Sequence, residues 1–144
     1  MKLRAATPLD AGRVGEILSG FIDGTEWMPR VHTRAEDLAH AGDLIARGWV
    51  TVVEKEGTVK GFLAQDRSVI QSLYIAPDAQ GQGYGTALLM RAQERADLLT
   101  LWTFEANRGA QRFYERHGFT ERQRTDGAGN DEGLPDIEYE WRRS

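Results

Sequence analysis

The chain contains no cysteine and no long uninterrupted run of apolar residues. Without cysteine it forms neither disulfide bonds nor thiolate metal sites, and this composition suits a reducing cytoplasm. Residues 1–8 hold no apolar stretch of the length that a signal peptide requires. No segment approaches the roughly 20 apolar residues of a bilayer-spanning helix. We therefore expect a cytoplasmic protein with no membrane partner and no bound metal.

The charge balance is mildly acidic, with 22 aspartate and glutamate residues against 18 lysine and arginine residues. Such a surface does not attract the phosphates of nucleic acid, so we expect no nucleic-acid partner. It suits a cationic substrate such as an amine, although many proteins share this balance. At 144 residues the chain has the size of one domain, 1–144, which buries a core without disulfide or metal staples.

The stretch LYIAPDAQGQGYGT, residues 73–86, organises the rest of the chain. It predicts a strand that ends at Pro77, a turn with glycine at 81, 83 and 85, and the start of a helix. The first N–H groups of a helix have no partner within the helix and lie at the positive end of its dipole. The loop is therefore suited to a phosphate or pyrophosphate. Its glycine spacing does not match the G-x-G-x-x-G of dinucleotide-binding loops, and without a lysine it is not a Walker loop.

Hydrophobic spacing and turn signals divide the chain into short strands and helices. Thr33 and Glu36 match a capping box at the start of one helix, and Asn107 is a favoured cap of another. Val69–Ile75 is apolar on both faces, as expected for the centre of a sheet that is covered on both sides. The expected strands are 2–6, 49–54, 58–64, 69–75, 98–104, 119–124 and 137–141. The expected helices are 8–22, 33–47, one that follows the glycine turn and ends near residue 97, and 107–117.

A second motif, NRGAQRFYERHGF, occupies residues 107–119. Together with Gln80-x-x-Gly83-x-Gly85 it resembles the two signatures of the GNAT acetyltransferase superfamily. The element order, β-α-α-β-β-β-α-β-α-β-β, is also similar to that family. The resemblance implies an α/β (α+β) GNAT fold, a mixed central sheet of about seven strands flanked by about four helices.

The resemblance further implies acetyl-CoA as co-substrate and direct acetyl transfer without a covalent enzyme intermediate. Tyr114 matches the family tyrosine that protonates the departing CoA thiolate; the alternative is that it packs in the core. Arg108 or Arg112 is a candidate for the 3′-phosphate of CoA, the alternative being a solvated helix face. The positions implied in binding acetyl-CoA are Leu73, Tyr74, Ile75, Gln80, Gly81, Gln82, Gly83, Tyr84, Gly85, Thr86, Asn107, Ala110, Arg112 and Phe113.

The general base stays open at this stage. The family often uses a glutamate on a central strand or a water chain, but the strand here offers Gln71 and Ser72, and neither is basic. Ordered water is one alternative, and the candidate side chains on loops are Glu26, His32, Glu132 and Asp136. Trp27 either lines the acceptor pocket or covers the edge of the core. The expected acceptor contacts are Glu26, Trp27, His32 and Gln71, while His40 and His117 are expected on a helix surface and in packing.

Three functions follow from these residues. The first is an N-acetyltransferase that acts on a primary amine of a small molecule or peptide. The second is a non-catalytic acyl-CoA-binding sensor, suggested by the missing strand base. The third is a protein N-terminal or lysine acetyltransferase, which needs an open groove between loops 23–33 and 127–134. A homodimer formed through the last strand is a further expectation by analogy with the family.

Overall fold

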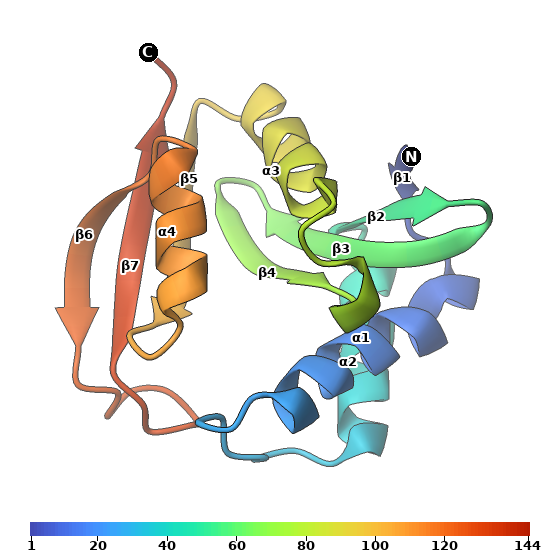
Figure 1. Ribbon diagram of the computed structural model, residues 1–144, viewed down its shortest axis with the longest axis horizontal. Coiled ribbons are helices and arrows are strands. Elements are labelled where there is room, and N and C mark those ends of the chain that lie inside the picture. Colours follow the sequence, from blue (N-terminus) through green and yellow to red (C-terminus); the bar gives the residue numbers. More distant parts are fainter.

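The computed structural model describes residues 1–144 and contains one seven-stranded sheet with helices on both faces (Figure 1). The strand order is β1-β2-β3-β4-β5-β7-β6, and all neighbouring strands are antiparallel except β4 and β5. None of the helices is long and apolar enough to cross a membrane. The strands are β1 (Lys2–Ala5), β2 (Val50–Lys55), β3 (Thr58–Asp66), β4 (Val69–Ile75), β5 (Leu98–Phe104), β6 (Thr120–Thr125) and β7 (Asp136–Arg142); the helices are α1 (Ala11–Gly24), α2 (Arg34–Ala46), α3 (Tyr84–Glu94) and α4 (Arg108–Arg116), with 3-10 turns η1 (Pro8–Asp10) and η2 (Pro77–Ala79).

The predicted element order and fold class are confirmed, because local signals fix most of the boundaries. The capping box of α2 forms as expected: the Glu36 N–H donates to Thr33 Oγ1 at 3.1 Å and the Thr33 N–H donates to Glu36 Oε1 at 2.9 Å. Two helices differ from the prediction in their bounds. The helix expected from residue 8 begins as the 3-10 turn η1 and continues to Gly24, and α3 ends at Glu94 rather than near residue 97.

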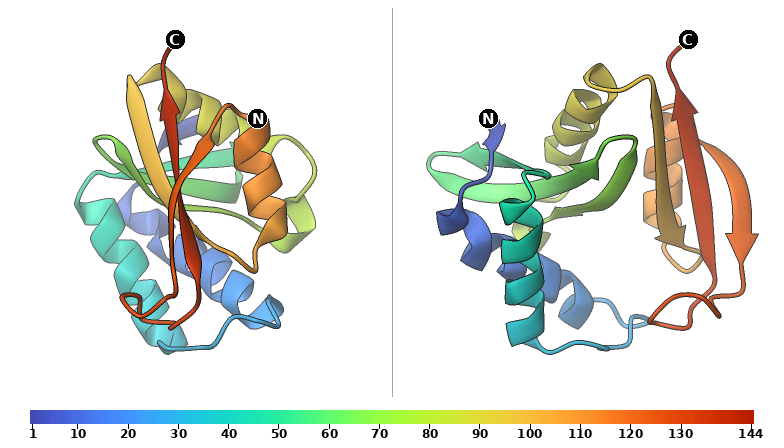
Figure 2. Two further views of the ribbon diagram at one scale, coloured as in Figure 1. Left: turned by 90° about the vertical axis from the view of Figure 1, so that its left-hand side faces the viewer. Right: turned by 180° about the vertical axis from the view of Figure 1, so that it is seen from behind.

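The helices cover the sheet in two pairs, α1 with α2 on one face and α3 with α4 on the other (Figures 1 and 2). On the first face Phe21 of α1 packs against Tyr74 of β4, with ring centroids 4.8 Å apart. On the second face Tyr114 of α4 packs against Tyr139 of β7 at 6.3 Å. The apolar side chains between these layers form one cluster of 25 buried residues, so the two halves of the sheet share a core.

The sheet opens between β4 and β5. These parallel strands share one register pair, Val69 with Thr100, next to a hydrogen bond of 2.8 Å from the Thr100 N–H to the Ser68 carbonyl oxygen. Beyond that point they diverge, and the opening is visible between the green and yellow strands in Figure 1. As predicted, β4 is a central strand contacted by helices on both faces, α1 on one and α3 on the other. Among its residues only Ile70 is fully buried, because the strand borders the opening.

Candidate active site

A groove of about 710 Å³ runs along the opened edge of β4 and is walled by α1, α3 and α4. Its floor includes the three β4 residues Leu73–Ile75, and one end is formed by the glycine loop between η2 and α3. Gly81 and Gly83 of that loop have φ angles of 74° and 89°, a left-handed conformation that glycine adopts without the strain of a Cβ atom. The sequence signal for a tight turn at this place is thus confirmed.

The backbone amides of this loop are free to bind a ligand. None of the six N–H groups from Gly81 to Thr86 donates a hydrogen bond to another protein atom, and the first helical bond at this end of α3 is the one from the Ala87 N–H to the Gly83 carbonyl oxygen. Free N–H groups at a helix N-terminus form a site for an anion such as a pyrophosphate. The residues present therefore fit the diphosphate of a coenzyme A molecule.

The side chain of Tyr114 also lines the groove. The side chain of Asn107 caps α4 by accepting a hydrogen bond of 3.1 Å from the Ala110 N–H, and Tyr114 follows one turn later. Its ring packs against Phe113, Phe119 and Tyr139 at centroid distances of 5.3, 5.5 and 6.3 Å. Its hydroxyl makes no hydrogen bond to the protein, whereas every fully buried side-chain nitrogen or oxygen in the structure has a partner. The hydroxyl therefore keeps some accessible surface, and Tyr114 is among the residues that line the groove.

A small cavity of about 80 Å³ adjoins this groove and shares Leu73, Tyr74 and Tyr114 with its lining. It lies where β4 and β5 diverge, and its wall includes Gln71, Tyr74 and Tyr114. Burial raises the pKa of Tyr114 above its ordinary value, and the nearby Tyr74 adds to this rise. Burial also raises the pKa of Tyr74 to about 12, with a contribution from the Glu132 carboxylate. Both phenols therefore carry their protons at neutral pH and can donate them.

A second pocket of about 430 Å³ lies on the α1–α2 side of the opening. It is bounded by the α1–α2 connection and by the β6–β7 loop, which run beside each other at the bottom of the molecule (Figures 1 and 2). Ser72, Tyr74 and Phe104 line both this pocket and the small cavity. The groove, the small cavity and this pocket, called the acceptor-side pocket below, are thus neighbours that share lining residues at the opening of the sheet.

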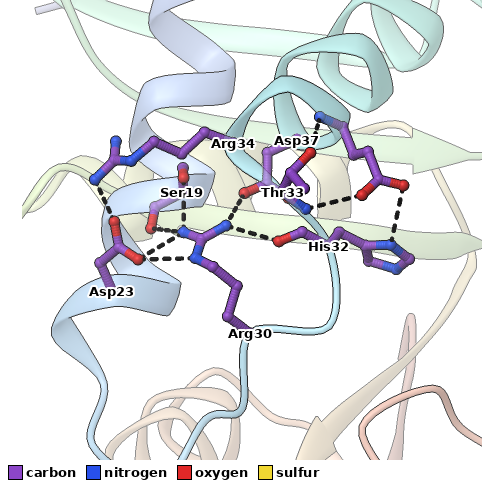
Figure 3. Close-up of polar contacts among 8 residues, drawn as sticks. Ser19, Asp23, Arg30, His32, Thr33, Arg34 and Asp37 are labelled. Carbon is purple, nitrogen blue, oxygen red and sulfur yellow. Dashed lines mark hydrogen bonds and ion pairs between the residues drawn. The ribbon is translucent and has the colours of Figure 1, made fainter.

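Arg30 holds the wall of the acceptor-side pocket in place (Figure 3). Its guanidinium donates to Ser19 Oγ at 2.8 Å, to Asp23 Oδ1 at 2.7 Å, to Asp37 Oδ2 at 2.9 Å and to the His32 carbonyl oxygen at 2.9 Å. These partners come from α1, α2 and the connection between them, so one side chain fixes the path of the loop. Such a fork of donors is a property of arginine that lysine does not share.

Most of the residues predicted to bind acetyl-CoA are brought together around the groove. The lining includes Leu73, Tyr74, Ile75, Gln80, Gly81, Gly83, Tyr84, Gly85, Thr86, Asn107, Ala110, Phe113 and Tyr114. Of the predicted acceptor contacts, Gln71 lines the small cavity and His32 lines the acceptor-side pocket. His40, which was expected simply on a helix surface, lines that pocket too, while His117 packs as expected against Phe113 at 4.6 Å.

Other predicted residues lie outside these cavities. Gln82 and Arg112 do not line the groove, and Arg116, one turn beyond Arg112 on α4, does. Glu26 is exposed and lines none of the three spaces. Trp27 packs edge-on against Phe21 and Phe104 at 6.4 and 5.8 Å, so it covers the core edge rather than lining a pocket.

The two carboxylates suggested together as a base are separated. Asp136 accepts hydrogen bonds from Thr125 Oγ1 and, at 3.1 Å, from Asn130 Nδ2, and so ties the β6–β7 loop together. Glu132 lines the acceptor-side pocket instead. No group of three or more histidine, aspartate and glutamate side chains is arranged to hold a metal ion.

Sequence reasoning missed the contribution of α1 to the groove. Gly20, Phe21, Gly24 and Thr25 line it. Phe21 lies at core spacing in the helix, and nothing local distinguishes it from a purely structural residue. The glycines at 20 and 24, four apart on one face of the helix, are the one available signal, because together they leave that face without side chains.

Comparison with known proteins agrees with this geometry. The sequence profile of the acetyltransferase (GNAT) domain matches residues 45–121, just over half of the chain. The chain belongs to the GNAT acetyltransferase family. It is 34% identical over 109 residues to the peptidyl-lysine N-acetyltransferase YjaB of Escherichia coli, covering 74% of each protein.

Two further relatives match a shorter part of the chain. An N-acetyltransferase of Methanocaldococcus jannaschii is 32% identical over 80 residues, 52% of this chain and 31% of the relative. The 5-NmdU N-acetyltransferase of Pseudomonas phage PaMx11 is 34% identical over 82 residues, 51% of this chain and 59% of the relative. The chain therefore spans less than two thirds of the length of these two proteins.

Solved GNAT structures share the whole fold. The apo form of YjaB from Escherichia coli superposes with a TM-score of 0.82 at 21% identity, covering 99% of this chain and 98% of that one. YncA of Salmonella typhimurium, solved with acetyl-CoA, gives a TM-score of 0.79 at 22% identity, covering 100% of this chain and 94% of that one. At these sequence identities the superpositions show that the fold is shared and nothing more specific.

Proposed function

We propose that this GNAT protein transfers the acetyl group of acetyl-CoA to a primary amine, with Tyr114 as the general acid. The observation that carries the proposal is the run of six unpaired amides at Gly81–Thr86, in a groove that is also lined by Tyr114, whose hydroxyl has no partner in the protein. The acetyl-CoA in the related YncA structure supports this assignment of the groove. The opened edge of β4 supplies main-chain groups for the pantetheine arm in the manner of an added strand.

In the proposed reaction the protein positions the two reactants and donates one proton. The amine nitrogen, once neutral, forms a bond to the thioester carbonyl carbon, and the carbon–sulfur bond breaks. Tyr114 donates its proton to the departing thiolate and regains one from solvent. Overall an ammonium and a thioester give an amide, a free thiol and one proton. A main-chain N–H of β4 stabilises the charge on the carbonyl oxygen as it forms.

The acceptor enters from the opposite side of the sheet, through the acceptor-side pocket. The ring of His32 lies 3.6 Å from Asp131 across the mouth, so the two loops enclose a pocket rather than an open channel. A single extended amine-bearing chain fits such an entrance better than a peptide main chain. Peptidyl-lysine, the acceptor named for YjaB and for YiaC, both of Escherichia coli, meets this requirement because its side chain alone must enter.

The direct test is release of free thiol from acetyl-CoA in the presence of candidate amines. Lysine-containing peptides blocked at the N-terminus, peptides with a free N-terminus but no lysine, and small alkylamines separate the acceptor classes. We expect thiol release with the N-terminally blocked lysine peptides and with the small alkylamines, and none without an amine. Acetyl-CoA binding by calorimetry without turnover of any amine would instead identify a sensor and refute the catalytic proposal.

A further inference from the structure

Four carboxylates line the acceptor-side pocket: Glu36, Asp37, Asp131 and Glu132. Three of them have partners within the protein. Asp37, whose side chain is 5% exposed, is paired with Arg30 at 2.9 Å (Figure 3). Glu36 accepts the Thr33 N–H in the capping box and lies 3.8 Å from His32, and Asp131 lies 3.6 Å from the same imidazole.

Glu132 differs from these three because it makes no hydrogen bond and no ion pair within the protein. It is half-buried rather than exposed, and it shares the pocket with the apolar side chains of Leu18, Ile22, Met28 and Phe104. Moving a carboxylate toward an apolar environment without a partner is unfavourable. A cation that enters the pocket removes this penalty by pairing with it.

The position of Glu132 relative to the chemistry is also informative. Tyr74 lines all three spaces, and the charge of Glu132 contributes to the raised pKa of its phenol. The carboxylate thus acts electrostatically on a group at the junction between the pocket and the thioester groove. An ammonium held near Glu132 is already beside the route to the reacting carbonyl.

We propose that Glu132 is the specificity-determining residue that binds the ammonium of the acceptor, and that the pocket selects cationic alkylamines. This inference rests on the proposed function and adds the acceptor class and the residue that recognises it. The aliphatic part of the acceptor packs against Leu18, Ile22, Met28 and Val31, which line the same pocket. Each buried methylene then improves kcat/KM roughly fourfold, from about 0.8 kcal/mol per CH₂.

The experiment compares Glu132→Gln with Glu56→Gln, a matched change at an exposed carboxylate that lines neither the groove, the small cavity nor the acceptor-side pocket. Two acceptors of equal length are used at neutral pH: n-butylamine, which is cationic, and O-propylhydroxylamine, which is uncharged. Glu132→Asp keeps the charge on a shorter side chain. Thiol release gives kcat/KM, and calorimetry measures the binding of n-butylammonium to the protein with CoA bound.

We expect Glu132→Gln to lower kcat/KM for n-butylamine roughly 10- to 100-fold and to weaken butylammonium binding by a similar factor. In Glu132→Gln the KM for acetyl-CoA and the activity on the uncharged acceptor stay within twofold of the wild type. The control Glu56→Gln stays within twofold of the wild type on both acceptors. Glu132→Asp retains most of the preference for the cation.

Two results would overturn the inference. One is a Glu132→Gln variant that matches the wild type on n-butylamine, and the other is an equal loss on the charged and uncharged acceptors. Neither result is the same as failure of the proposed function, which is an absence of thiol release by the wild-type protein with every amine. In that case the calorimetric comparison still decides whether Glu132 binds an ammonium.

Discussion

Replacing Tyr114 with phenylalanine removes one atom that the fold does not use and the proposed chemistry requires. The hydroxyl makes no hydrogen bond within the protein, and the ring keeps its contacts with Phe113, Phe119 and Tyr139 in the variant. We therefore expect Tyr114→Phe to leave the free energy of unfolding within about 0.5 kcal/mol of the wild type. The groove also keeps its shape, so the Kd for acetyl-CoA stays within about twofold.

The catalytic effect is expected to be large. Loss of a general acid typically lowers the rate by about 10²- to 10⁴-fold, and the lower end of that range corresponds to about 2.7 kcal/mol of transition-state stabilisation. Because burial keeps the pKa of Tyr114 above its ordinary value, the wild-type phenol stays protonated throughout an assay between pH 7 and 9. The loss in kcat is therefore present across this whole range.

The control is Tyr139→Phe, which removes a hydroxyl from a neighbouring tyrosine outside the groove. Tyr139 is 1% exposed and its hydroxyl donates to Glu115 at 2.9 Å. This variant loses about 1–2 kcal/mol of stability because a hydrogen bond to a charged group is removed, and it keeps its kcat. Thermal unfolding and thiol release measured on both variants give opposite patterns.

The reasoning is refuted if Tyr114→Phe retains more than half of the wild-type kcat. It is also refuted if the variant loses activity only in proportion to a lost fraction of folded protein. The comparison with Tyr139→Phe separates these outcomes, since that variant supplies the effect of destabilisation alone. An unchanged kcat with intact acetyl-CoA binding would mean that solvent protonates the thiolate.

Three further predictions concern the loops and the pH range. Gly83→Ala and Gly48→Ala both place a Cβ in open space at φ angles of 89° and 78°, so we expect each variant to lose about 1–2 kcal/mol of stability. Only Gly83→Ala is expected to bind acetyl-CoA more weakly, by roughly tenfold in calorimetry. Equal acetyl-CoA affinities of the two variants would contradict the loop assignment. Arg30→Lys is expected to raise the KM for the amine and not for acetyl-CoA, whereas Arg34→Lys, at a 68% exposed side chain, leaves both unchanged in steady-state assays. The pKa of Tyr74 is raised to about 12, and the pKa values of Tyr114 and Tyr139 are raised as well. Because the unfolded chain releases these protons at lower pH than the folded protein, the free energy of unfolding from denaturant titrations is expected to fall between about pH 10 and 12. A flat profile in this range would contradict the burial of these phenols.

The sequence predicted the elements well wherever a local signal exists. The capping box at Thr33 and Glu36, the Asn107 cap and the glycine turn before α3 each form as expected. These signals act within a few residues, so tertiary contacts do not override them. The boundaries of α1 and α3 were missed because helix ends depend on the last turn, where packing and capping compete.

The candidate site could be predicted only in part, for a related reason. Motif spacing indicated the loop and Tyr114, but it did not indicate that Arg116 rather than Arg112 borders the groove, since both lie at helical spacing on α4. The position of Phe21 in the groove could not be predicted either, because a core residue and a groove residue have the same apolar character. Which face of a helix meets an opening depends on where the sheet opens, and no local pattern encodes that.

The opening between β4 and β5 explains why this site occurs where it does. A sheet that separates loses the ladder bonds between those strands, so other contacts must hold its halves together. The bridge from Phe21 through Trp27 to Phe104 provides this on one face. On the other face α3 and α4 approach closely at Gly85, where an added Cβ would lie 3.4 Å from the ring of Phe113. The same separation exposes main-chain groups of β4 and lets Tyr74 and Tyr114, which pack on opposite faces of the sheet, line one cavity. The loss of ladder bonds and the candidate active site therefore have the same structural origin.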